Sequence, residues 1–141
     1  MPDFKLFTLD EAERTLPLVQ RIVQDLTAEY PAWRAAVARF ELITGGARAD
    51  WGETGELLAA REAIAGHAEQ INRYLQELEV VGCVFKGFEA GLVDFYSLRD
   101  DRPIFLCWRL GEERITHWHE IDSGFAGRQP IDASILSAVP S

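Results

Sequence analysis

The sequence predicts an α+β fold: a short N-terminal helix, a long antiparallel helical hairpin, and then an antiparallel meander of three or four strands. Two observations predict it. Apolar residues recur at steps of three and four up to about residue 78, and from about residue 91 they alternate with polar residues. We expect one domain over 1–141, with the hairpin at about 8–80, the meander and a glycine-rich tail at about 81–132, and a frayed end at 133–141.

The composition excludes several classes of partner. The net charge is -9, from 14 basic and 23 acidic residues, which argues against nucleic acids and anionic membranes. The first residues do not form a secretory signal, and no apolar run approaches the roughly 20 residues of a spanning helix. Cys83 and Cys107 form no C-x-x-C pair, so we expect free thiols and a cytoplasmic protein.

Thr8 and Glu11 have the spacing of a capping box and predict a helix start. Because proline clashes with the carbonyl four residues before it, Pro17 predicts a short helix over about 9–14 and a second helix with Pro17 in its first turn. Pro31 predicts a kink in this second helix.

The apolar positions of the two long helices follow a heptad rhythm typical of coiled-coil packing. We expect Gly45-Gly46 to end the first helix in a left-handed conformation and Asp50 to cap the second. Each helix of about 28 residues would be about 40 Å long, so the tip of the hairpin should project beyond the sheet.

Three stretches of alternating pattern, 91–98, 103–110 and 114–119, predict the strands, with turns at Asp100-Asp101 and at 111–113. The segment 81–85 is either a further short strand or an irregular connection.

A two-residue turn at Asp100-Asp101 pairs Asp94 with Cys107 and defines two faces of the sheet. The first face is the more apolar and should pack on the helices. It is expected to hold Val93, Phe95, Ile104, Leu106, Trp108, Ile115, His117 and His119. The second is expected to hold Leu92, Asp94, Tyr96, Phe105, Cys107, Arg109, Thr116, Trp118 and Glu120, and either the tail or a second subunit should cover it. A one-residue shift or a bulge would invert the third strand. A homodimer is our preferred state.

The sharpest chemical signal is the pair His117 and His119. Histidines two apart on a strand share a face and can bind one zinc or iron ion, with Glu120 as third ligand and Asp122 or Glu89 as substitutes. The structural alternative places both imidazoles at the sheet edge, hydrogen-bonded to backbone or a carboxylate, with Trp118 in the core. An apolar face also gives a metal little solvent access.

Arg109 is unusual in so apolar a strand. It should pair with Asp94 or Glu120, or else bind a carboxylate or phosphate of a ligand. Arg128, beside Gly124 and Gly127, either helps to bind an anion or lies in a glycine-rich corner. Cys107 as a nucleophile would need a histidine base, from which the predicted pairing separates it. The chain carries no nucleotide or haem signal.

Several motifs together resemble a bacterial family known as domain of unknown function number 2203. They are Phe7-Thr-Leu-Asp-Glu-Ala12, Leu16-Pro17, Gly91-Leu-Val-Asp-Phe95, Leu106-Cys-Trp-Arg-Leu-Gly-Glu112, His117-Trp-His-Glu120 and Gly124-Phe-Ala-Gly-Arg-Gln-Pro-Ile131. Tyr96 departs from the family, which is expected to favour proline there. The resemblance implies a small cytoplasmic protein without an assigned activity. It also implies that Asp94, Arg109, His117, His119, Glu120 and Arg128, which fall within these motifs, belong to one site.

Two hypotheses follow. The first is a divalent-metal-binding protein or small metal-dependent enzyme, with His117, His119 and Glu120 as ligands and Arg109, Asp94 and Arg128 around a bound ligand. The second is a non-catalytic dimeric interaction module that engages a protein partner through its helical hairpin. The residues alone leave open whether the protein is an enzyme.

Overall fold

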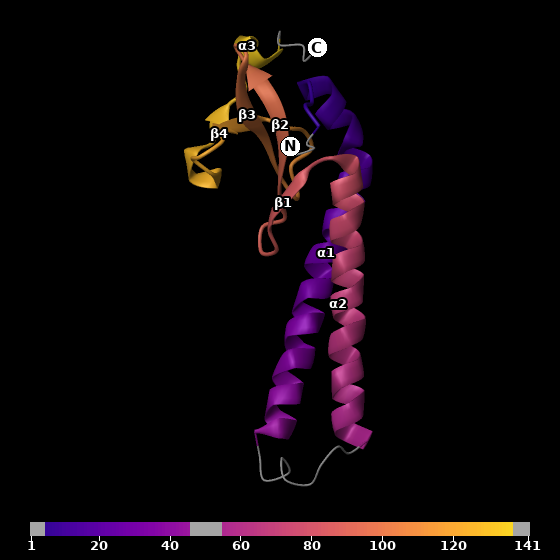
Figure 1. The fold of residues 1–141 in the computed structure, drawn as a ribbon. Coiled ribbons are helices and arrows are strands. Elements are labelled where there is room, and N and C mark those ends of the chain that lie inside the picture. Colours follow the sequence, from indigo (N-terminus) through magenta and orange to yellow (C-terminus); the bar gives the residue numbers. More distant parts are fainter. Residues whose placement is uncertain (1–4, 46–54, 137–141) are drawn as a thin grey trace.

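The structure is a computed structural model that describes residues 5–45 and 55–136 (Figure 1). Its elements in chain order are α1 (Leu9–Thr44), α2 (Gly55–Val81), β1 (Val84–Gly87), β2 (Leu92–Arg99), β3 (Arg102–Arg109), β4 (His117–Glu120), the 3-10 turn η2 (Phe125–Gly127), β5 (Gln129–Pro130) and α3 (Ala133–Leu136). The α+β fold and the helical hairpin are therefore confirmed.

The helix α1 begins at the predicted capping box. The backbone N–H of Glu11 donates to Thr8 Oγ1 at 3.0 Å, and the Thr8 N–H donates to Glu11 Oε1 at 2.9 Å. The separate helix over 9–14 is wrong, because α1 continues through Pro17 and Pro31. Leu16 and Val19 lie on either side of Pro17 and are buried in the same core. Their packing offsets the cost of about 3 kcal/mol that a proline imposes on a helix interior.

The two long helices pack against each other as the predicted hairpin, and their far end extends well beyond the sheet (Figure 1). At 36 residues α1 is about 54 Å long. It ends at Gly45 as expected, but with φ of −80°, so Gly45 does not adopt the left-handed conformation. The predicted roles of Gly46 and Asp50 lie outside the described residues. Within the described ranges, every helix is too short or too polar to span a membrane.

The sheet has five antiparallel strands in the order β1-β2-β3-β4-β5, one more than the upper prediction because of the two-residue β5. The undecided segment after α2 leads into a strand, β1. The turn between β2 and β3 is the predicted two-residue hairpin, since Asp100 and Asp101 have φ of 51° and 63°. The predicted pairing of Asp94 with Cys107 is confirmed.

The predicted faces of the third strand are wrong. In β4, Trp118 pairs with Leu106 and His119 pairs with Phe105. Because paired residues share a face, Trp118 lies on the core face and His119 lies on the second face with Asp94 and Cys107. The physical reason is the size of Trp118, which is 2% exposed and packs in the main core. Burying this indole removes far more apolar surface from water than burying the flanking imidazoles would.

Each face of the sheet has its own cover. The helices lie against the first face, and the segment between β4 and β5 turns to the side away from them (Figure 1). Ile121, Gly124 and Phe125 from that segment form a cavity wall over the second face. The sequence predicts that either the tail or a second subunit covers this face. Around Asp94, the tail covers it.

Replacing Pro17 by alanine tests whether α1 is one continuous helix. Pro17 is exposed, so the change removes little packing and restores an N–H that can donate to the Glu13 carbonyl. We expect Pro17→Ala to raise the free energy of unfolding in urea by about 2 kcal/mol, after allowance for the looser unfolded chain. Gln20→Ala, at another exposed position of α1, serves as the control. A neutral or destabilising Pro17→Ala would instead indicate a helix that starts near Pro17.

Candidate metal centre

Three adjacent strands bring three potential metal ligands together on the second face of the sheet. They are Asp94 of β2, Cys107 of β3 and His119 of β4, and their ligand atoms all lie within 4.8 Å of one another. The three residues are 3%, 1% and 2% exposed. Among the described residues, this is the one group of three or more such side chains close enough to hold a single ion.

The hydrogen bonds of His119 fix the orientation of its ring. Nδ1 lies 2.7 Å from the Glu120 carbonyl oxygen, which can only accept, so Nδ1 carries a proton. Nε2 faces both carboxylate oxygens of Asp94 at 3.1 Å. Histidine ligands of metals commonly donate their other ring N–H to a backbone carbonyl in this way. The Nε2 atom is therefore held in the place and orientation of a ligand.

Burial governs the protonation of the other two groups. It raises the pKa of the Asp94 carboxyl, while His119 and then Lys86 act in the opposite direction. Burial also raises the pKa of the Cys107 thiol to about 12, and the charge of Asp94 adds to that shift. Without a cation, Cys107 is thus a thiol next to a carboxylate, which argues against a cysteine nucleophile. A divalent ion would reverse this balance, because it stabilises the thiolate.

A cavity of about 260 Å³ opens onto the three donors. Its walls are formed by Lys86, Leu92, Asp94, Cys107, His119, Ile121, Gly124 and Phe125. Lys86 sits where the pairing of β1 with β2 shifts between Phe85 and Gly87. Such bulges are frequent beside functional sites, where they redirect a side chain. The centre is buried but has space beside it for a small ligand.

Of the predicted metal ligands, only His119 belongs to this group. His117 Nδ1 lies 2.8 Å from the Thr116 hydroxyl, and the Glu120 carboxylate pairs with Arg102 at 2.9 Å. Glu120 is adjacent to His119 on a strand, so its side chain points to the opposite face. The His-Trp-His-Glu string therefore does not form the metal group. The suggested substitutes also lie elsewhere, since Asp122 is exposed and Glu89 lines another cavity.

The predicted pairing of Arg109 with Asp94 or Glu120 is also replaced by other pairs. Asp94 pairs with His119 and Glu120 with Arg102. The exposed Arg109 places its guanidinium 5.9 Å from the centre of the Phe125 ring.

Arg128, the third predicted ligand-binding residue, is held by other groups. It donates to both carboxylate oxygens of Glu112 at 2.9 and 3.1 Å and to the Cys107 carbonyl at 3.3 Å. Its guanidinium also lies 4.7 Å from the Phe125 ring centre. Arg109 and Arg128 thus contact a wall of the cavity without lining it.

Sequence reasoning missed Cys107 as a member of this group and Lys86 as a neighbour of it. One signal was present. The indole of Trp118 is the bulkiest apolar group of its strand, and directing it to the core turns both flanking histidines toward Asp94 and Cys107. No comparable pattern marked Lys86, because its position depends on a bulge.

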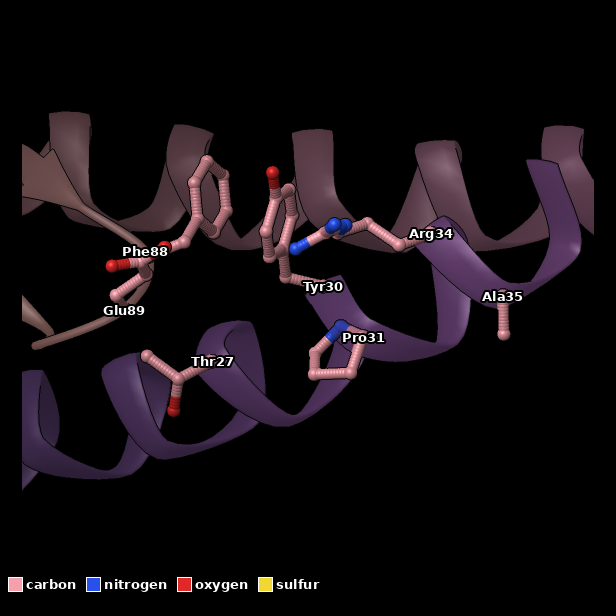
Figure 2. Close-up of a pocket in the computed structure, with 7 residues that line it drawn as sticks. All are labelled: Thr27, Tyr30, Pro31, Arg34, Ala35, Phe88 and Glu89. Carbon is pink, nitrogen blue, oxygen red and sulfur yellow. The ribbon is translucent and has the colours of Figure 1, made fainter. Parts of the chain in front are cut away.

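A larger cavity of about 560 Å³ lies beside Pro31 of α1 (Figure 2). The rings of Tyr30 and Phe88 form part of its wall and are stacked, with centres 4.3 Å apart. The guanidinium of Arg34 lies 5.9 Å from the Tyr30 ring centre. Glu89 supplies its one carboxylate. It has space for a ligand but no group of metal-binding side chains.

Removing His119 should destabilise the metal-free protein far more than removing His117. Without His119, the buried Asp94 carboxyl loses its main partner, whereas His117 has only a neighbouring hydroxyl. We expect His119→Ala to cost about 2–4 kcal/mol and His117→Ala less than about 1 kcal/mol. Urea unfolding in the presence of a chelator measures both. Equal losses would show that the Asp94–His119 contact contributes little.

A family model described as "Uncharacterized conserved protein (DUF2203)" matches residues 5–131. No curated protein and no solved structure matches the chain. The matched range includes both long helices, all five strands and the three donors. The chain therefore belongs to the uncharacterised conserved family DUF2203, as the motifs of the sequence had indicated.

Proposed function

We propose that this protein binds one divalent transition-metal ion through Asp94, Cys107 and His119. The observation that carries the proposal is the convergence of a carboxylate, a thiol and an imidazole within 4.8 Å at the base of a cavity. The three side chains also contact one another, since Asp94 accepts hydrogen bonds from both His119 and the Cys107 thiol. What favours a metal over structural pairing alone is that all three donors face the same cavity.

The charges of the site support the exchange of protons for a metal. Burial raises the pKa of the Asp94 carboxyl and of the Cys107 thiol, so without a cation the group resists carrying two negative charges. A divalent cation would balance one carboxylate and one thiolate, so the loaded group would carry no net charge. Binding would therefore avoid the large penalty of adding charge to a buried site.

The donor set favours zinc or iron(II). A thiolate and an imidazole are softer ligands than magnesium and calcium prefer, whereas zinc and iron(II) accept sulfur, nitrogen and oxygen together. Three protein ligands also leave a coordination position free, as in catalytic rather than structural zinc sites. In the cavity, an ion would supply Lewis acidity to a bound ligand, which is the basis for a metal-dependent enzyme.

Metal binding is tested by titrating chelator-treated protein with Zn²⁺ against a chromophoric chelator. The wild type should bind one ion, and Asp94→Ala, Cys107→Ser and His119→Ala should each weaken binding by more than about tenfold. His117→Ala, Glu120→Gln and Cys83→Ser are matched controls, because they change the same residue types outside the group. If His119→Ala bound zinc as tightly as the wild type, the proposal would be wrong.

A second candidate function is that of a dimeric interaction module. Near the far end of the hairpin, Leu42 and Leu58 are 81% and 46% exposed. This end of the hairpin extends away from the sheet (Figure 1), so the sheet does not cover the exposed Leu42 and Leu58. We propose a second copy of the chain as the occupant, since heptad-patterned helices associate readily with their own kind. A different protein partner is the competing occupant.

Light scattering tests the dimer. The wild type should have a mass of roughly twice 15.9 kDa, and the double variant Leu42→Lys/Leu58→Lys should approach the monomer mass. Leu18→Lys is the control, because Leu18 is also exposed on α1 but lies at the other end of the hairpin. A wild type that stays monomeric at all concentrations would refute the second copy.

A further inference from the structure

We infer that the free coordination position at Asp94, Cys107 and His119 receives a small monocarboxylate with an apolar body, oriented by Lys86. The inference rests on the proposed metal site and adds the chemical class of its ligand. Three features carry it: the charge of the loaded site, the composition of the cavity walls and the size of the cavity.

The charge of the loaded site leaves room for one negative charge. A divalent ion, one carboxylate and one thiolate sum to zero, with His119 neutral. Lys86, an exposed residue, contributes a positive charge at the cavity wall, and in the ion-free site this charge acts on Asp94. Its ammonium lies 5.1 Å from the centre of the Phe105 ring, which is on the same face of the sheet as His119. A monoanion bound to the metal would bring the site to neutrality.

Arg109 and Arg128, the two arginines predicted to bind a ligand, do not change this sum of charges. Arg128 is matched by Glu112, and this ion pair is largely buried, with the side chains 12% and 18% exposed. The exposed Arg109 does not line the cavity. A phosphate, with a charge of about −1.5 to −2 at neutral pH, would leave excess negative charge beside low-dielectric walls. A neutral ligand would gain nothing from the charge of Lys86.

The wall residues and the volume of the cavity indicate the size and polarity of the part of the ligand that carries the carboxylate. Leu92, Ile121 and Phe125 are apolar, and they supply no hydrogen-bonding side chain to a polar body. The volume of about 260 Å³ is close to nine times the roughly 30 Å³ of a liquid water molecule. It is below the range of about 300–1,000 Å³ for sites of drug-sized ligands. A short branched or small aromatic carboxylate fits these limits.

Cobalt(II) is the probe, because its visible spectrum reports both the protein ligands and the fourth one. Isobutyrate, isobutyramide and inorganic phosphate are added separately to the cobalt-loaded full chain. Isobutyramide is the matched control, since it has the shape of isobutyrate without the charge. We expect isobutyrate to change the ligand-field bands with an affinity about tenfold or more above that of the other two.

Lys86→Gln should weaken isobutyrate binding by about tenfold. Lys5→Gln makes the same change of charge at Phe7, which belongs to the main core, and should leave that affinity unchanged. Equal isobutyrate affinity in the wild type and Lys86→Gln would overturn the role of Lys86.

The spectra separate failure of the inference from failure of the metal site. A thiolate-to-cobalt charge-transfer band that is present in the wild type and lost in Cys107→Ser verifies the site itself. If that band is absent, the metal site and the inference both fall. If it is present but isobutyrate leaves the spectrum unchanged, or phosphate or isobutyramide binds as tightly, the metal site stands and the inference is wrong.

Discussion

The register between β3 and β4 is the constraint on which the rest of the structure depends. Setting Trp118 against Leu106 buries the indole in the core between sheet and helices. The same register turns His119 to the other face, where Asp94 and Cys107 already lie opposite each other. Burying the indole of Trp118 thus also positions the imidazole of His119, because neighbouring side chains on a strand point to opposite faces.

The second face of the sheet is also buried at its centre, but there with polar residues. Asp94 and His119 are both nearly inaccessible, which is costly unless they satisfy each other. Their mutual contact and the Glu120 carbonyl provide partners, and the chain after β4 encloses them. Buried titratable groups beside a cavity are frequent at functional sites, although structural pairs share this feature.

The two ends of the molecule suit different tasks. The group of Asp94, Cys107 and His119 lies on the face of the sheet that the helices leave uncovered, and the exposed Leu42 and Leu58 lie near the far ends of α1 and α2 (Figure 1). The family model spans both parts. A ligand at the metal and a partner at the hairpin would therefore occupy separate surfaces of the same chain.

Local patterns in the sequence determined the α+β fold, the helical hairpin, the capping box at Thr8 and Glu11, and the pairing of Asp94 with Cys107. Each of these depends on residues near one another in the chain or on a tight turn. Only the tertiary structure decided that α1 runs through Pro17 and that His119, rather than the whole His-Trp-His-Glu string, joins the site. Both outcomes depend on packing in a shared core, of Leu16 and Val19 in one case and of Trp118 in the other. When a strand follows a longer connection, the alternation of its residues does not show which set of side chains faces the core. Either set fits the pattern, and the burial of one large side chain decides between them.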